Sequence, residues 1–245
     1  MRILSLNPAA TELLYAIGAG GSLVGRCDGC DYPAAALTVP SIGPAAEMTA
    51  ERAAILEPDL VLLGPGQEAI ASRLGTLRLS MLRCASVEEC LGSIIALAKT
   101  VGNEVEADVL VHDLRTAFDT VRERTARFKR TRVYAETRHE PWGTSPLVNE
   151  LITIAGGEPF PGPIATLPEL VRFEPHAIIV SVAGEGDRFD PELLLARDGW
   201  GELPAVRGER VFTVDDALLH RPGPRLAQGV KLLAKLLHGV HVNGN

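Results

Sequence analysis

The chain has 245 residues, of which 46% are apolar and 22% charged, a composition that supports a sizeable core and argues against disorder. Acidic residues outnumber basic ones by 31 to 24, and the formal net charge of −7 argues against nucleic acid or an anionic membrane surface as the main partner. Only 4% of the residues are aromatic, so few rings are available to stack on a ligand. The length allows one large domain or two small ones.

The N-terminal residues 1–6 enter an expected strand directly, with no charged leader, apolar region or cleavage site before it. No apolar run approaches the ~18–20 residues that a membrane span needs. As written, the sequence predicts a cytoplasmic protein without membrane insertion. If a leader was removed, the same chain would be periplasmic or on the cell surface.

Four cysteines are too few for a disulfide scaffold in a chain of this length. Cys27 and Cys30 form a C-x-x-C pair, which could be a redox pair or half of a metal site. Cys84 and Cys90 are too far apart in sequence for the usual second half of a zinc site. We therefore expect reduced thiols without a catalytic role.

The first half of the chain alternates short apolar strands with helices. Helix signals include Pro8 after the first strand, Thr49 as an N-cap, and Ser86 with Glu89 as a capping box. Residues 60–63 are apolar on both faces, which is typical of a buried parallel strand. The expected strands are 3–6, 23–25, 60–63 and 77–82, and the expected helices are 8–17, 49–57 and 86–101.

Residues 104–128 contain no Gly or Pro, and apolar residues recur there at helical spacing. We expect one helix of about 25 residues, or roughly 37 Å at 1.5 Å per residue. Such a helix is typical of a bridge between two lobes, and an ordinary surface helix is the alternative.

After this helix the pattern begins again, with strands expected at 132–135 and 177–180 and helices at 146–155 and 166–173. Glu12-Leu13-Leu14 before Gly20-Gly21 parallels Glu150-Leu151-Ile152 before Gly156-Gly157, and Glu57-Pro58-Asp59 parallels Glu174-Pro175-His176. This repeat predicts two similar α/β lobes, and a single doubly wound sheet is the alternative.

No local motif favours an enzyme. The glycines at 18–21 end a helix instead of opening one, and neither a P-loop nor a G-x-S-x-G motif occurs. Polar or Gly/Pro-rich loops instead follow the expected strands, at residues 7–11, 27–33, 64–67, 138–143 and 220–225. Ligands of parallel α/β sheets lie outside the carboxyl ends of the strands, so loops from two facing lobes would form a cleft for a small molecule.

Four segments resemble a known family in the right order. These segments are ILSLNPAATELLYAIGAGGSLVGRCDGCDYP at 3–33, ERAAILEPDLVLL at 51–63, GTSPLVNELITIAGGEPF at 143–160 and RPGPR at 221–225. They are similar to the substrate-binding proteins for vitamin B12 and ferric siderophores of ABC importers, in the helical-backbone metal receptor superfamily. The CDYP segment most resembles the members named cobalamin-binding proteins.

The resemblance implies a class III periplasmic-binding-protein-like fold, with two Rossmann-like lobes that contain parallel sheets and are joined by one long bridging α-helix. The corresponding boundaries are 1–102 for the N-terminal lobe, 103–128 for the helix and 129–245 for the C-terminal lobe. It also implies non-catalytic binding of cobalamin, or alternatively of a ferric siderophore or haem, by a monomer that serves an ABC permease or acts as a leaderless cytoplasmic relative. No covalent cofactor and no resident metal are expected.

The family pattern carries over onto a set of candidate ligand-binding residues: Pro8, Ala9, Ala10, Gly29, Cys30, Tyr32, His139, Trp142, Gly143, His220 and Arg221. In this interpretation Trp142 would stack on a macrocycle face, and Arg221 would pair with an anionic group or an amide oxygen. Tyr32 could instead belong to the core, and the histidines could be ordinary loop residues.

The family's importer-docking pattern has an exposed glutamate on a short helix in each lobe, and Glu51 and Glu169 match it. Glu169 lies one residue nearer its following proline than Glu51 does, which departs from the pattern. Ala45, Gly64 and Leu218 stand where cobalamin-binding relatives often have aromatic rings. An alternative from another class is a cytoplasmic thiol or metal-site protein that uses Cys27 and Cys30.

Overall fold

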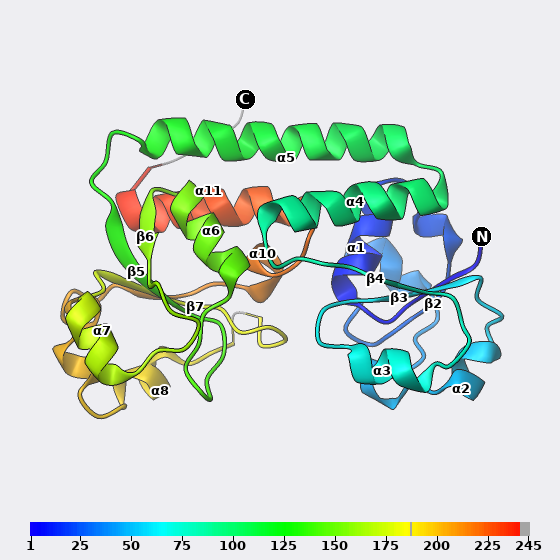
Figure 1. Ribbon diagram of the computed structural model, residues 1–245, viewed down its shortest axis with the longest axis horizontal. Coiled ribbons are helices and arrows are strands. Elements are labelled where there is room, and N and C mark those ends of the chain that lie inside the picture. Colours follow the sequence, from blue (N-terminus) through cyan, green and yellow to red (C-terminus); the bar gives the residue numbers. More distant parts are fainter. Residues whose placement is uncertain (187, 241–245) are drawn as a thin grey trace. The chain divides into compact units, whose positions relative to one another are not determined.

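The computed structural model describes residues 1–186 and 188–240, which form two compact α/β units (Figure 1). Unit 1 comprises Met1–Cys84, Glu88–His112 and Arg221–Pro224, and unit 2 comprises Ala85–Val87, Asp113–His220 and the chain from Arg225 on. The expected boundaries at 102/103 and 128/129 stay a prediction. Each unit has its own parallel sheet, so the alternative of one doubly wound sheet is wrong and the two-lobed α/β fold is confirmed.

The sheet of unit 1 has four parallel strands in the order β2-β1-β3-β4. The middle strands β1 and β3 are completely buried, as the continuous apolar sequence of residues 60–63 predicts for β3. The strands are β1 (Ile3–Ser5), β2 (Leu23–Arg26), β3 (Leu60–Leu63) and β4 (Leu79–Met81). The helices are α1 (Pro8–Ala16), α2 (Ala50–Ala54), α3 (Glu68–Arg73) and α4 (Val87–Val101). Helix α5 (Glu104–Thr125) belongs to unit 1 up to His112 and to unit 2 from Asp113 on.

The sheet of unit 2 repeats this topology in the order β6-β5-β7-β8, again with all strands parallel. Its strands are β5 (Thr131–Glu136), β6 (Gly157–Pro159), β7 (Ala177–Val180) and β8 (Val211–Thr213). Its helices are α6 (Pro146–Ile154), α7 (Leu167–Phe173), α8 (Pro191–Leu195), α9 (Pro204–Arg207), α10 (Asp216–Leu219) and α11 (Arg225–His238).

The internal repeat extends to the way the first helix of each unit ends. Helix α1 is followed by Gly18 at φ 75° and helix α6 by Gly156 at φ 82°, a left-handed conformation that glycine adopts without steric cost. A Cβ at Gly156 would lie 2.8 Å from the Cβ of Thr125, so the close approach of α5 also requires glycine there. The backbone conformation at these two helix ends therefore explains why the sequence has glycine there.

The long helix α5 covers 22 residues and ends at Thr125, three residues before the expected end at Phe128. The Thr125 hydroxyl donates back to the carbonyl of Val121, and the Phe128 amide donates to the carbonyl of Thr125, which closes a final turn. Phe128 then stacks on His238 at a centroid distance of 5.1 Å. Apolar spacing continued past Thr125 because Phe128 packs against α11 instead of extending the helix.

Candidate ligand-binding site

In unit 1, polar groups gather where β1 and β3 end. Asn7 caps helix α1 by accepting a hydrogen bond from the amide of Ala10 at 3.1 Å. The Gln67 amide donates to the carbonyl of Leu6 at 2.8 Å, and its oxygen accepts from the amide of Gly64 at 2.7 Å. These bonds hold the loop after β3 against the loop after β1, at the edge of the sheet where ligands of parallel α/β folds bind.

Two buried thiols lie at the same edge. The sulfur atoms of Cys27 and Cys30 are 3.3 Å apart, and both cysteines are free in the structure, as expected. The hydrogen bond from Cys27 lowers the pKa of Cys30 to about 7 against the effect of burial, with smaller contributions from Thr11 and Ser5. The same hydrogen bond and burial raise the pKa of Cys27. Cys30 is therefore the more acidic thiol of the pair.

The loop after β2 lies beside the first turn of α1 and beside Arg221. A Cβ added at Gly29 would lie 3.4 Å from Pro8, and the Arg221 guanidinium is 3.5 Å from the Asp31 carboxylate. The structure therefore brings Pro8, Gly29 and Arg221 into one region of unit 1, although Arg221 is far from the other two in sequence.

The remaining unit 1 candidates differ in what they can offer to a ligand. Ala9, Ala10 and Cys30 are buried, so their side chains are covered by the core. Tyr32 is 43% exposed, which contradicts its alternative interpretation as a core residue. Pro8, Gly29, Tyr32 and Arg221 remain as the accessible part of this predicted set.

In unit 2 a buried carboxylate lies at the corresponding edge of the sheet. Glu136, the last residue of β5, is fully buried and receives two hydrogen bonds from Arg197, at 2.7 and 2.8 Å. Its second partner is the Nδ1 atom of His139 at 2.6 Å, and the Nε2 atom of His139 is 3.2 Å from Glu185. Burial lowers the pKa of His139, but the hydrogen bonds and charges of Glu136 and Glu185 outweigh burial and raise it.

Both tryptophans of the chain are part of this network. The Arg197 guanidinium lies 5.0 Å from the ring centre of Trp142 and 4.7 Å from that of Trp200, and the two rings meet edge to face. Trp200 is completely buried, whereas Trp142 is half-buried. The Arg197 guanidinium thus fixes the orientation of the Trp142 ring, which the sequence predicts to contact a ligand.

A hollow of about 360 Å³ opens next to this network, and it is lined by His139, Glu185, Arg188, Phe189, Asp190, Leu193 and Arg197. Phe189 stacks on the imidazole of His139 at a centroid distance of 4.9 Å. The Asp216 carboxylate accepts hydrogen bonds from the amides of Gly184 and Gly186, both at 3.1 Å, and so ties the loop after β7 to α10. The imidazole of His139 therefore lines a solvent-accessible hollow of unit 2.

His220 and Gly143 stabilise the packing of loops in unit 2. The Nε2 atom of His220 is 2.8 Å from the carbonyl of Ser181, and burial lowers the pKa of this imidazole. Gly143 is buried, and a Cβ there would lie 2.9 Å from the carbonyl oxygen of Pro163. His220 belongs to unit 2 and Arg221 to unit 1, so the division of the chain separates these two neighbours.

Sequence reasoning missed Glu136 and Arg197. A carboxylate directly after the apolar residues 133–135 was a usable signal, because a charged residue at the end of a buried strand usually has a partner. Arg197 follows the short helix α8, 61 residues away from Glu136, and nothing near it in sequence indicates this partner.

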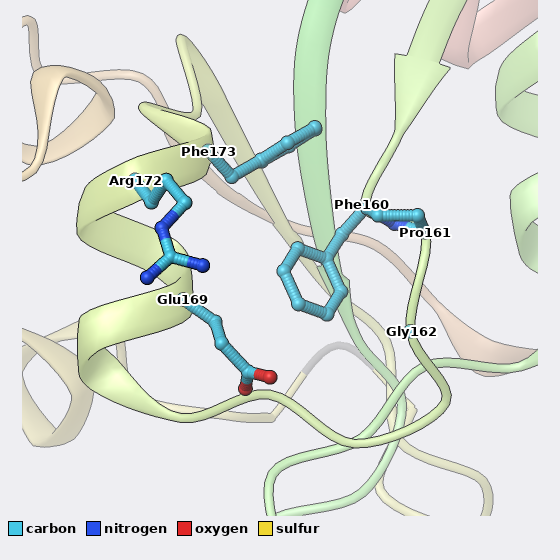
Figure 2. A pocket seen from close by; sticks show the side chains of 6 residues that line it. All are labelled: Phe160, Pro161, Gly162, Glu169, Arg172 and Phe173. Carbon is cyan, nitrogen blue, oxygen red and sulfur yellow. The ribbon is translucent and has the colours of Figure 1, made fainter.

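The two expected docking glutamates lie on the short helices α2 and α7, each in the first turn after a threonine N-cap. Both carboxylates are exposed, and hydrogen bonds to the local backbone and to the capping threonine lower the pKa of each. Glu169 also lines a hollow of about 460 Å³ whose other lining residues include Phe160, Arg172 and Phe173 (Figure 2). Its capping box with Thr166 places Glu169 at the third helical position, whereas Glu51 occupies the second.

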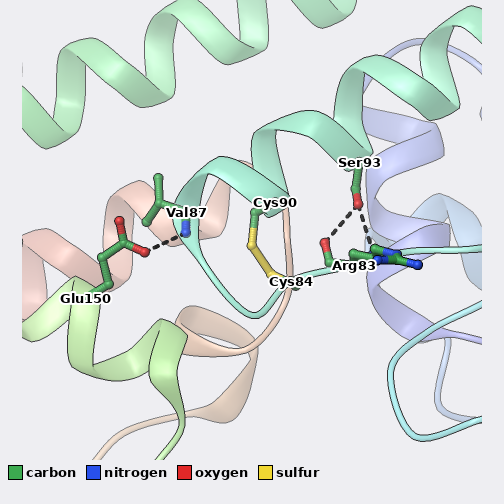
Figure 3. Close-up of a disulfide and its surroundings, with 6 residues drawn as sticks. All are labelled: Arg83, Cys84, Val87, Cys90, Ser93 and Glu150. Carbon is green, nitrogen blue, oxygen red and sulfur yellow. Dashed lines mark hydrogen bonds between the residues drawn. A yellow bond between two sulfur atoms is a disulfide. The ribbon is translucent and has the colours of Figure 1, made fainter. Parts of the chain in front are cut away.

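Cys84 and Cys90 form a disulfide at the start of α4 (Figure 3). The expectation of reduced thiols is therefore wrong for this pair. The helix begins at Val87, so its first turn brings Cys90 back toward Cys84, with Cα atoms 4.5 Å apart. Spacing arguments tested this pair only as metal ligands and overlooked the return of the chain. Within the described part of the chain, no helix has the length and apolar character of a membrane span.

Comparison with known proteins places the chain in a family. The family model described as periplasmic binding protein matches residues 3–218. An uncharacterised ABC transporter substrate-binding lipoprotein of Bacillus subtilis, YvrC, is 28% identical over 97% of this chain and 80% of its own length. The vitamin B12-binding protein of Vibrio cholerae is 24% identical over 96% of this chain and 88% of its own length.

A solved structure has the same fold across almost the whole chain. The periplasmic haem-binding protein BhuT, in complex with two haems, superposes with a TM-score of 0.79 and 24% identity, covering 96% of this chain and 97% of that one. These findings give no support to the thiol or metal-site alternative. Together with the paired α/β units, the match over residues 3–218 shows that this chain belongs to the periplasmic binding protein family.

Proposed function

We propose that this protein is the ligand-binding component of an ABC importer and that it holds a metal-bearing organic ligand, cobalamin first and a ferric siderophore or haem second. The observation that carries the proposal is the set of polar side chains at the carboxyl edge of both sheets, in a chain whose family consists of binding proteins. The names of the relatives, one a vitamin B12-binding protein, favour cobalamin.

In unit 1 we propose Pro8, Gly29, Tyr32 and Arg221 as ligand contacts, with Ala9, Ala10 and Cys30 supporting them from the core. In unit 2 we propose His139 and Trp142, with Gly143 and His220 shaping the loops around them. Trp142 is half-buried and one side of its ring contacts Arg197, which leaves the ring able to contact a ligand.

The first experiment is a titration with cyanocobalamin, with haemin as the second ligand, followed by calorimetry and by tryptophan emission. Both tryptophans belong to unit 2, so their emission gives a spectral readout there, and calorimetry measures binding independently of it. Saturable binding of cyanocobalamin is expected. Absence of heat and of spectral change at millimolar cyanocobalamin would overturn the cobalamin assignment, and saturable binding of haemin in its place would assign haem.

Trp142→Ala should weaken ligand binding by about 1–3 kcal/mol if the ring covers part of the ligand. Val105→Ala is the matched control, because Val105 is an exposed apolar residue on α5 in unit 1. Equal affinities for Trp142→Ala and Val105→Ala would remove Trp142 from the site.

We also propose that Glu51 and Glu169 dock the protein on its permease. Both carboxylates are exposed and ionised near neutral pH, since their pKa values are lowered. Glu51→Arg and Glu169→Arg should abolish ligand uptake in cells while affinity for the ligand stays unchanged. Glu47→Arg, on an exposed glutamate of unit 1, is the control. Normal uptake by both docking variants would contradict this assignment.

The Cys84–Cys90 disulfide and the lipoprotein relative support a location outside the cytoplasm. In this interpretation the protein acts as a monomer that binds a small molecule and a permease. Thiol alkylation of intact cells tests the location, because Cys84 and Cys90 should resist a maleimide until a reductant is added. Alkylation of both without reductant would place the protein in a reducing compartment.

A further inference from the structure

We propose that Glu136 and Arg197 are positioning residues of the unit 2 ligand site, and that the site binds its ligand most tightly when His139 is protonated on both ring nitrogens. The ligand-binding part rests on the proposed function, whereas the protonation of His139 can be tested without any ligand. The four segments that resemble the family contain neither Arg197 nor Glu185.

Each ring nitrogen of His139 faces a carboxylate. The Nδ1 atom is 2.6 Å from Glu136, and the Nε2 atom is 3.2 Å from Glu185. A carboxylate only accepts hydrogen bonds, so both contacts are satisfied together only if each ring nitrogen carries a proton. A neutral imidazole has one N–H and would present a lone pair to one of the two carboxylates.

The two carboxylates are not equivalent, and this decides which contact is lost on deprotonation. Glu136 is fully buried and held by two hydrogen bonds from Arg197, whereas the Glu185 side chain is 39% exposed. Leaving a buried carboxylate short of a partner costs more than releasing an exposed one to water. Deprotonated His139 therefore keeps its Nδ1–H on Glu136 and turns a lone pair toward Glu185.

Repulsion between the lone pair of deprotonated His139 and the Glu185 carboxylate would displace one wall of the hollow. Glu185, Arg188 and Phe189 belong to the loop between β7 and α8, and Phe189 stacks on the His139 ring. The amides of Gly184 and Gly186 keep this loop tied to Asp216, so the released part is the side that faces His139. Loss of the Glu185 contact thus opens the hollow at its rim without unfolding the loop.

Other charged groups around His139 have partners that do not change over the relevant pH range. Arg188 donates to the carbonyls of Gly184 and Glu185, Arg138 donates to the carbonyl of Pro141, and Asp190 caps α8. Burial raises the pKa of Tyr134, which therefore stays neutral. Asp187 lies outside the described residues. His139 is thus the titrating group in contact with both Glu136 and Glu185.

Arg197 connects this protonation site to the aromatic ring. Its guanidinium pairs with Glu136 through two hydrogen bonds and lies against Trp142 and Trp200. A planar guanidinium presents two N–H groups to a carboxylate and its flat face to a ring, a geometry that an ammonium group does not reproduce. Arg197→Lys should therefore retain the charge beside Glu136 but release Trp142, which predicts a change in tryptophan emission.

The ligand-free test follows the imidazole signals of His139 by NMR against pH, with His112 and His176 as exposed references. Glu185→Gln should lower the pKa of His139, because the variant keeps the shape of the side chain and removes one negative charge. Glu192→Gln, at an exposed glutamate on α8, is the matched control and should leave His139 unchanged. An identical His139 pKa in wild type and Glu185→Gln would overturn the proposal.

The binding test measures the affinity for cyanocobalamin, or for haemin if that ligand binds, between about pH 5.5 and 8.5. Wild type should lose affinity several-fold as the pH rises. Glu185→Gln should show a flat profile, because an amide can pair with either form of the imidazole. A wild-type profile without pH dependence overturns the proposal, whereas absence of binding at every pH overturns the proposed function and leaves the NMR result to stand.

Discussion

The two units have the same sheet topology, yet the polar groups at their carboxyl edges differ in kind. In unit 1 the groups beside the two thiols are neutral hydroxyls, with the Thr11 hydroxyl donating to Ser5 at 2.8 Å, and the charged pair of Arg221 and Asp31 lies at the loop after β2. In unit 2 the polar groups are charged, with Glu136 buried between Arg197 and His139. The shared fold therefore positions a binding edge in each unit, and the side chains decide its chemistry.

The difference also changes which conditions each edge responds to. Unit 1 has a thiol, Cys30, whose pKa is lowered to about 7 by its hydrogen bond from Cys27. Unit 2 has an imidazole, His139, whose pKa is raised by its two carboxylates against the effect of burial. We expect thiol chemistry to affect unit 1 and mild changes of pH to affect unit 2.

The largest expected effect tests the charged edge itself. Glu136→Gln removes the buried negative charge that pairs with Arg197, whose side chain is only 18% exposed, and should lower the free energy of unfolding by about 3–5 kcal/mol. Ser5→Ala in unit 1 removes a neutral hydrogen-bonding group and should cost about 1 kcal/mol. Urea denaturation measures both.

Glu174→Gln is the control for the loss of a carboxylate, because Glu174 pairs with Arg132 at the surface and should contribute less than about 1 kcal/mol. If Ser5→Ala destabilises the protein as much as Glu136→Gln does, the contrast between a neutral and a charged edge is wrong.

The second prediction concerns a covalent feature of unit 1. Cys84→Ser with Cys90→Ser opens the short disulfide loop and should cost about 2 kcal/mol on the chain-entropy estimate. Reductant should lower the unfolding free energy of wild type by a similar amount and leave that of the double variant unchanged. Cys27→Ser with Cys30→Ser is the control, which should retain sensitivity to reductant.

The third prediction compares the first helix of each unit. Asn7 caps α1 through its side chain, whereas Ser145 makes no side-chain cap on α6. Asn7→Ala should therefore cost about 1 kcal/mol of unfolding free energy, and Ser145→Ala should cost far less. Equal losses in urea denaturation would show that the two helix starts are energetically alike.

Much of this architecture could be predicted because it follows local rules. Glu57 and Glu174 precede the buried strands β3 and β7, and both adopt a left-handed conformation, at φ 44° and 50°. The repeated Glu-Pro signature therefore marked a repeated backbone turn. Buried strands and glycine helix ends could be predicted for the same reason, since each depends on residues close in sequence.

The site could be predicted only in part, because its decisive contacts join distant residues. His139 and Trp142, in the short loop after β5, were predicted through the family resemblance. Arg197, which positions Trp142 and neutralises Glu136, is 61 residues from Glu136. Local spacing cannot report such a pair. Burial of Ala9 and Ala10 was also hidden, since it depends on how α1 packs on the sheet of unit 1.

The smallest predicted effect separates two histidines within unit 2. The pKa of His139 is raised, so its contribution to stability is complete below the unfolded value of about 6.5 and is lost as the pH rises through the folded value. Burial lowers the pKa of His220, so its contribution is present above about 6.5 and is lost as the pH falls. The destabilisation by His139→Asn, about 1 kcal/mol or less, should therefore shrink between pH 6 and 8, whereas that by His220→Asn should shrink between pH 7 and 5. Urea denaturation across this pH range, with His112→Asn as the surface control, measures how each destabilisation changes with pH. If both destabilisations change with pH in the same direction, burial governs the pKa of both imidazoles, and Glu136 and Glu185 do not raise the pKa of His139 measurably.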